Sequence, residues 1–282
     1  QILVLTDGHA NAGIVDPVRL AEMARSAASQ GITTTCIGFA NGYDQRLLAT
    51  IADAGRGNDY WCAGPDQAGS VFRTEFEGLA NVVAQNMSVE IRPAASVVET
   101  LVLNEYPTTS VPGGVQVALG DAYGGERRRV VAMLRLAPHS QEGSVQVAEL
   151  VLRYAEVGDE IGLHTITIPV TVEFTGDTSS VEINTEVQEL VVQLRAARAR
   201  KDASDLADRG DYSGAAELLN ESVELLACTS MSEIELDEIR RDADRLRRHE
   251  WDAASTKRHF ASSREVQRER KLRFEKELRP EE

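Results

Sequence analysis

The residue best placed to do chemistry is Asp7, which stands where a short apolar run meets a glycine. The run Ile2–Thr6 is typical of a strand in a parallel sheet that is covered on both faces. In open α/β sheets the carboxyl ends of such strands face the crevice where ligands bind. Asp7 is therefore a candidate binding residue. An aspartate here also commonly caps the following turn, so the residues alone leave both interpretations open.

No other arrangement of reactive side chains predicts catalysis. The five histidines show no metal-binding spacing, and the sequence has neither a Gly-x-Ser-x-Gly elbow nor a phosphate-cradling Gly-Lys loop. Cys36, Cys62 and Cys228 are too few and too scattered for a disulfide framework or a zinc site. We expect Cys36 and Cys62 to be buried thiols, in a reducing, cytoplasmic compartment. We predict no catalytic or cofactor-binding residues, and a protein that is not an enzyme.

The charge is distributed unevenly along the chain. The formal net charge is −15 over 282 residues. Residues 231–282 carry 14 acids and 14 bases, so the whole acidic excess lies in residues 1–230. An acidic body argues against nucleic acid as the main partner. No apolar run approaches the roughly 20 residues that a membrane-spanning helix needs, so we expect no membrane span.

Residues 1–85 alternate three apolar strands with three amphipathic helices. This pattern predicts a partial, Rossmann-like α/β unit with a parallel sheet. Asp16-Pro17 and Asp44 predict the starts of the first two helices. The third helix is expected from Asp66 to about Gln85, with a buried stripe formed by Val71, Phe72, Phe76, Leu79, Val82 and Val83.

The period of the apolar residues changes after residue 85. Residues 86–180 alternate apolar and polar positions in short runs separated by turns, which predicts an antiparallel β-sandwich. Pro169 lies inside the last of these strands and indicates an edge position or a bulge.

The last part of the chain divides into a helical segment, residues 181–250, and a charged tail, residues 251–282. Residues 181–250 read as a bundle of three helices, with a break at Gly210-Asp211 that resembles the turn of a tetratricopeptide-type pair. A single such unit predicts a helical hairpin that packs on the sandwich, and a peptide-binding role is the lesser alternative. Residues 251–282 form a sign-alternating charged tail, for which we expect a solvated helix or disorder.

Residues 1–85 resemble the second half of a von Willebrand factor type A domain. The resemblance rests on the strand that ends in Thr6-Asp7-Gly8 and on the runs at residues 34–39, 44–48 and 52–61. With the sandwich and helices that follow, the layout is similar to bacterial proteins related to the calcium-activated chloride channel and inter-alpha-trypsin inhibitor groups. The run Leu119 to Arg127 resembles a conserved hairpin turn of their sandwich.

This resemblance implies a role for Asp7. Asp7 matches one aspartate of the family's metal-ion-dependent adhesion site (MIDAS), where Mg²⁺ or Mn²⁺ would bridge to a carboxylate of a protein partner. The family's Asp-x-Ser-x-Ser motif and separate threonine lie upstream of the matched strand, and this sequence does not supply them. We therefore expect that the N-terminal half of the A domain is missing, and that this chain alone holds a partial site without a bound metal.

The leading hypothesis is a non-enzymatic protein-interaction module whose partner the sequence does not identify. One alternative is a phosphotransfer enzyme that depends on Asp7, although residues 1–85 contain no lysine to bind phosphate. The other is a purely structural scaffold. The surfaces we expect in any self-association are the open sheet edge beside Ile2–Thr6 and the charged tail.

Overall fold

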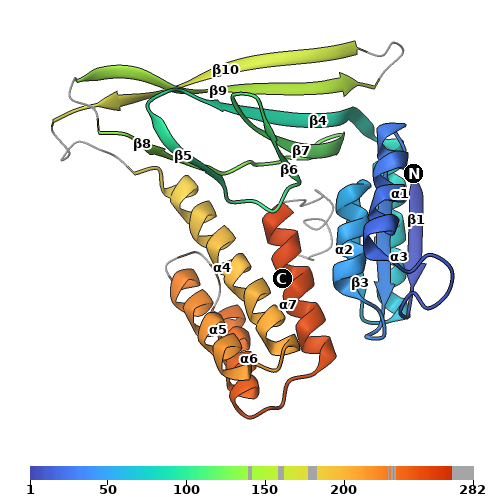
Figure 1. The fold of residues 1–282 in the computed structure, drawn as a ribbon. Helices are drawn as coiled ribbons and strands as arrows, with labels where there is room; N and C mark the ends of the chain where they lie inside the picture. Colours follow the sequence, from blue (N-terminus) through green and yellow to red (C-terminus); the bar gives the residue numbers. More distant parts are fainter. Residues whose placement is uncertain are drawn as a thin grey trace, which may run out of the picture.

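The structure is a computed structural model, and it describes residues 1–138, 142–157, 162–176, 183–227, 229, 231 and 233–268. It contains an α/β unit, a β region and a helical region in chain order (Figure 1). This order confirms the expected fold class. Within the described residues, no helix is both long enough and apolar enough to cross a bilayer.

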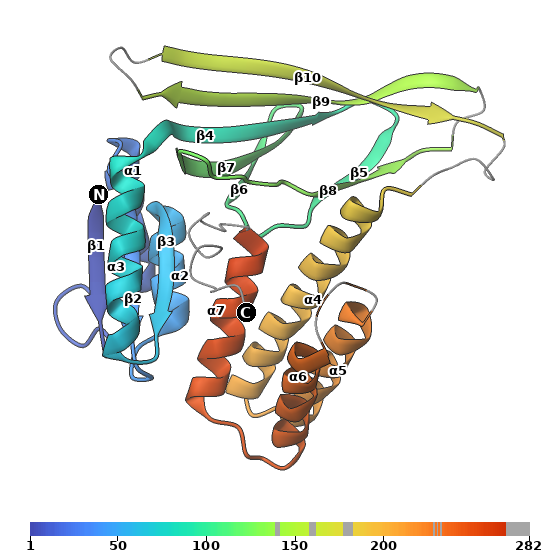
Figure 2. The same ribbon diagram turned by 180° about the vertical axis from the view of Figure 1, so that it is seen from behind.

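The α/β unit has a three-stranded parallel sheet with strand order β1-β2-β3. The strands are β1 (Ile2–Thr6), β2 (Thr34–Phe39) and β3 (Arg56–Cys62). The helices are α1 (Pro17–Ser29), α2 (Gln45–Ala54) and α3 (Pro65–Ala80). Helices α1 and α2 cover one face of the sheet and α3 covers the other (Figures 1 and 2).

The strand order places β1 at the open edge expected beside Ile2–Thr6, although β1 is less covered than its apolar sequence predicted. Strand β2 lies between its two neighbours, and residues 34–38 are buried. Strand β1 instead pairs on one side only, and Ile2 and Leu5 remain 43% and 48% exposed. The apolar run therefore predicted the strand and its open edge correctly, whereas the expected cover on both faces is found on β2.

The helix starts follow the predicted caps, whereas one helix end does not. The Asp16 side chain accepts from the Val18 amide with Pro17 in the first turn, and Asp44 accepts from the amides of Arg46 and Leu47. Helix α3 ends at Ala80 rather than near residue 85.

The apolar run beyond α3 belongs to the next strand, so the predicted stripe is partly wrong. Strand β4 (Val82–Pro93) includes Val82 and Val83, because residues 82–91 pair with residues 115–123 and this pairing overrides the local helical pattern. On α3 itself, Phe76 is 59% exposed. The side chain of Leu79 lies outside the described part.

The β region is antiparallel, as expected. A five-stranded sheet has the order β10-β9-β4-β7-β6, and a separate pair joins β5 to β8. The remaining strands are β5 (Val97–Val102), β6 (Thr108–Val111), β7 (Gly114–Tyr123), β8 (Ala132–Leu136), β9 (Gly143–Glu156) and β10 (Gly162–Phe174). Pro169 lies on the edge strand β10, one residue before a register shift at Val170/Thr171. The edge and the bulge that Pro169 predicted are thus both present, whereas β6 was not predicted.

Four helices complete the described chain. They are α4 (Thr185–Asp208), α5 (Tyr212–Leu226), α6 (Glu233–Arg247) and α7 (Ala253–Arg268). Asp211 caps α5 at the predicted break. Helices α4, α5 and α6 share one apolar core of leucines, alanines, a valine and an isoleucine, centred on Leu219, Leu236 and Leu246. Burial of these side chains is the main contribution that holds the three helices together.

Helix α7 contradicts the expectation of a solvated tail. Residues 253–268 are helical, but nine of them are buried, including Lys257, Arg264, Gln267 and Arg268. In Figures 1 and 2, α7 lies between α4 and the α/β unit. Its charged residues are buried because they meet opposite charges and backbone carbonyls on the elements around it. Residues 269–282 of the expected tail lie outside the described part.

The two thiols in the α/β unit are buried as predicted, and Cys228 lies outside the described residues. Burial, with a smaller contribution from the charge of Asp59, raises the pKa of Cys36 to about 12. The unfolded thiol ionises near pH 9 while the folded one stays neutral. Cys36 therefore contributes stability in full below that pH, and the contribution is lost as the pH rises towards about 12.

We expect the Cys36 thiol to resist alkylation in the folded protein. With iodoacetamide at pH 8.5, peptide mapping should show labelling of Cys36 at least ~100-fold slower than in urea-unfolded protein, because the thiolate is the reactive species. The unfolded protein is the internal control. Comparable labelling rates in the two states would contradict burial of this thiol.

Candidate functional site

Asp7 lies at the carboxyl end of β1, on the crest of the parallel sheet. The turn there is fixed by Thr6, whose hydroxyl donates to the Gly8 carbonyl at 2.8 Å and accepts from the Gly8 amide at 3.2 Å. The Asp7 side chain is exposed and makes no hydrogen bond or ion pair with the described residues. The structure thus presents this carboxylate to solvent instead of using it as a cap.

A second loop packs against the backbone of Asp7. It connects β2 to α2, and a Cβ added to Gly42 would come within 2.6 Å of the Asp7 carbonyl oxygen. Glycine at position 42 therefore permits the close approach of the two loops. The Trp61 indole donates to the Ala40 carbonyl at 3.0 Å, which ties the same loop to β3.

Helix α7 also reaches this crest loop. The ammonium of Lys257, a residue only 3% exposed, donates to the Tyr43 carbonyl and to the Gln45 side chain, both at 2.7 Å. It also lies 3.9 Å from the centre of the Tyr43 ring. Burial lowers the pKa of Lys257, opposed by the charges of Asp44 and Asp208. The loop beside Asp7 is therefore held by a helix some 210 residues further along the chain.

The crest does not hold a complete set of metal ligands. Among the residues that the structure describes, no group of three or more His, Cys, Asp or Glu side chains could hold an ion. His9 is exposed and lies in the same loop as Asp7. One carboxylate does not satisfy Mg²⁺ or Mn²⁺, which require several oxygen ligands. The residues present do not fit a resident metal.

A buried carboxylate that was not predicted from the sequence lies on the sheet face covered by α3. Glu75 of α3 is 2% exposed and accepts hydrogen bonds at 2.6–3.0 Å from side chains on β2 and β3 and from the residue before β1. The donors are Gln1, Thr35, Asn58 and Tyr60. The polar positions in β2 and β3 were the available signal, because a side chain buried on a sheet face needs a partner. This network anchors α3 and is structural.

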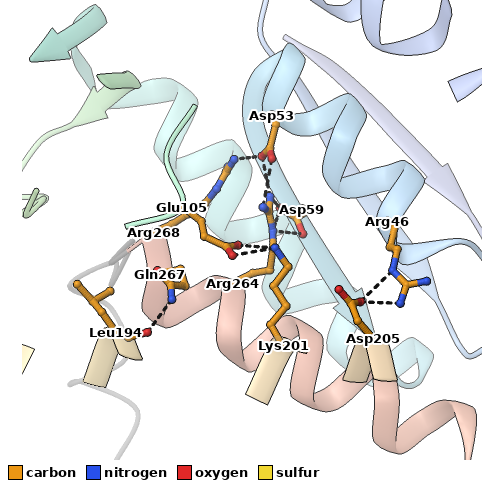
Figure 3. Close-up of polar contacts among 10 residues, drawn as sticks. All are labelled: Arg46, Asp53, Asp59, Glu105, Leu194, Lys201, Asp205, Arg264, Gln267 and Arg268. Carbon is orange, nitrogen blue, oxygen red and sulfur yellow. Dashed lines mark hydrogen bonds and ion pairs between the residues drawn. The ribbon is translucent and has the colours of Figure 1, made fainter. Parts of the chain in front are cut away.

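A second cluster joins α7 to the α/β unit (Figure 3). The Arg264 guanidinium is 6% exposed and contacts Asp59 at 2.5 Å and Asp53 at 2.7 Å. Arg268 also contacts Asp53 and donates to the Gly57 carbonyl at 3.1 Å. Two arginines one helical turn apart thus meet two carboxylates from α2 and β3. No local sequence pattern predicts this pairing, since the partners are more than 200 residues apart.

Helix α4 makes further polar contacts on both sides (Figure 3). Asp205 accepts from the exposed Arg46 of α2 at 2.6 Å. The Lys201 ammonium lies 2.8 Å from the carboxylate of Glu105, in the loop between β5 and β6. Gln267 of α7 donates to the Leu194 carbonyl at 2.8 Å. The α/β unit, the β region and the helices are therefore joined by charge pairs and side-chain-to-backbone bonds.

Comparisons with solved structures identify this architecture. A von Willebrand factor type A protein from Catenulispora acidiphila superposes with a TM-score of 0.69, at 17% identity over 93% of this chain and 64% of that chain. The ArnB paralog VWA2 from Sulfolobus acidocaldarius gives a TM-score of 0.56, at 16% identity over 95% of this chain and 63% of that one. The fold is that of the von Willebrand factor type A proteins. The resemblance stated from the sequence is thereby confirmed at the level of fold.

The curated sequence relatives of this chain are longer than it is. YfbK, an uncharacterised Escherichia coli protein, is 30% identical over 92 residues, which are 32% of this chain and 16% of YfbK. The uncharacterised Synechocystis protein sll0103 is 26% identical over 234 residues, 78% of this chain and 54% of that protein. The matched part of the chain thus spans about half the length of sll0103 and a smaller share of YfbK. No family model matches the sequence.

Proposed function

We propose that this protein is a non-enzymatic, A-type protein-interaction module that binds its partner at the crest around Asp7. The observation that carries the proposal is the placement of Asp7, an exposed and unpaired carboxylate at the carboxyl end of a parallel strand in an A-type fold. Ligands of open α/β sheets bind at this end of the strands. The loop of residues 40–45 lies beside it and is held in place by Lys257, which favours a preformed binding surface.

We further propose that metal-dependent binding arises only in a longer chain that includes residues upstream of β1. Such residues would supply the oxygen ligands that this crest lacks. The partner would complete the coordination with a carboxylate of its own. The incomplete ligand set around Asp7, together with the greater length of the relatives, supports this division.

The test uses titration calorimetry to compare Mn²⁺ binding by this chain and by a longer protein in which the chain is extended upstream of β1. We expect saturable binding in the longer protein alone. Asp7→Ala in that protein should weaken Mn²⁺ binding at least ~10-fold, because the substitution removes a carboxylate that would coordinate the ion. Glu22→Ala removes an exposed carboxylate of α1 and is the matched control. Unchanged binding in the Asp7 variant, or none in the longer protein, would refute the metal-dependent part of the proposal.

A further inference from the structure

A cavity of about 540 Å³ lies in the helical region, away from the crest. It is bounded by α4, α6, α7 and the segment between β7 and β8. Its volume lies within the range of small-molecule sites, about 300–1,000 Å³. None of the residues on its walls belongs to the crest around Asp7, so the cavity is a separate feature of the molecule.

Arg200 of α4 lines this cavity, and its guanidinium is unusual. The residue is 7% exposed, and its Nε has no hydrogen-bond partner. Across the described part of the chain, the structure records no side-chain hydrogen bond or ion pair for this guanidinium. Burial lowers the pKa of Arg200, and the charge of Glu235 opposes that effect. A buried cation without a close partner is costly to stability, so its retention calls for a physical reason.

The other cationic side chains on the cavity wall have carboxylate partners, some on the wall and some outside it. The Asp242 carboxylate lies 2.9 Å from the His259 Nε2 and 3.2 Å from the Arg258 guanidinium. Arg127 and Arg129, in the segment between β7 and β8, lie 3.7 Å and 3.1 Å from Glu186, which is not on the cavity wall. Arg200 differs from these residues, because it has no ion pair within the described residues and is offset only by the more distant charge of Glu235. An anionic group in the cavity would supply a close partner, because a guanidinium binds a carboxylate through paired N–H donors.

The wall also limits what kind of anion fits. Glu235, Glu238 and Glu265 line the cavity together with the arginines, so a multiply charged anion would meet repulsion. A ligand with one carboxylate and one cationic group would match both signs. Met231, Ile239 and Val266 supply apolar surface for an uncharged side chain. We propose that this cavity binds a small zwitterion of the amino-acid class, with its carboxylate on Arg200 and its ammonium towards the glutamates.

The proposal is tested by titration calorimetry of the full chain. The probes are the proteinogenic amino acids one at a time, with acetate as a simple carboxylate and inorganic phosphate as a dianion. We expect saturable binding of at least one amino acid, with acetate and phosphate much weaker. Arg200→Met should reduce the affinity about 10- to 100-fold, since hydrogen bonds to a charged donor are lost. Arg195→Met, an exposed arginine on the same helix, is the matched control and should change nothing.

Two further measurements separate a binding role from a structural one. Because Arg200→Met removes a buried, unpartnered charge, the ligand-free variant should melt at the same or a higher temperature than the parent. Ser262→Trp keeps Arg200 and fills the cavity from α7, so it should also abolish amino-acid binding. No saturable binding by any amino acid, binding by phosphate alone, or unchanged affinity in Arg200→Met would each overturn the proposal. These results are independent of Asp7, so they do not bear on the crest.

Discussion

Replacement of Arg264 by alanine should lower the free energy of unfolding by about 3–5 kcal/mol, the usual cost of removing one partner from a buried charge cluster. Arg264 contacts both Asp53 and Asp59 while its side chain is only 6% exposed. Arg268 would still contact Asp53, but Asp59, whose side chain is 13% exposed, would lose its charge partner. Urea denaturation followed by tryptophan fluorescence measures the change.

The Arg264 variant should also loosen α7 locally. Hydrogen exchange of the amides in residues 257–268 is expected to become at least ~10-fold faster, because the helix loses its main attachment to the α/β unit. Arg247→Ala is the matched control: Arg247 pairs with Asp244 at 2.9 Å but is 53% exposed, so the change should stay below about 1 kcal/mol. An effect of Arg264→Ala no larger than that of the control would show that the cluster contributes little.

Replacement of Glu75 by leucine should destabilise the protein by about 3 kcal/mol or more. The Glu75 carboxylate is the shared acceptor for Thr35 and Asn58, which are 0% and 8% exposed, as well as for donors at the sheet margin. Leucine would leave buried donors without an acceptor, and each such group costs roughly 1–3 kcal/mol. Thermal and urea denaturation measure the change.

Two variants make the Glu75 result specific. Glu75→Gln keeps one acceptor oxygen and should cost less than Glu75→Leu, at about 1–2 kcal/mol. Glu22→Gln alters an exposed glutamate on α1 and should be close to neutral. Equal losses for the Gln and Leu variants would mean that the charge, rather than the acceptor geometry, stabilises the site. A neutral Glu75→Leu variant would contradict the anchoring role.

Helix α7 contacts both the α2–β3 carboxylates and the loop beside Asp7. The same helix that places Arg264 against Asp53 and Asp59 places Lys257 on the loop beside Asp7. A variant that loosens α7 should therefore also raise hydrogen exchange in residues 40–45. Helix α7 thus connects the helical region physically to the proposed binding surface.

Local signals sufficed where the partner of a residue lies nearby in sequence. Asp16, Pro17 and Asp44 predicted helix starts because a cap bonds to amides two or three residues away. Pro169 predicted an edge because proline lacks the amide that an inner strand donates. The alternation of strands and helices, and the change of period after residue 85, predicted the order of the three regions.

Long-range pairing decided the features that the sequence analysis missed. Val82 and Val83 continue the apolar pattern of α3 but are recruited into β4 by pairing with β7. Phe76 has the right spacing for burial, yet the sheet beneath α3 is occupied by the Glu75 network. The tail charges alternate in sign as on a solvated helix, and only the packed arrangement shows that Arg264 has carboxylate partners.

The sequence by itself determined the α/β class, the placement of Asp7 at a strand end and the resemblance to A-type domains, because these depend on short-range periodicity and on one motif. Tertiary structure alone decided that α7 is buried against the α/β unit and that Arg200 lines a cavity without a hydrogen-bond partner for its Nε. The physical reason is that burial and charge pairing depend on which surfaces meet in space. A side chain's type and its sequence neighbours do not specify those surfaces.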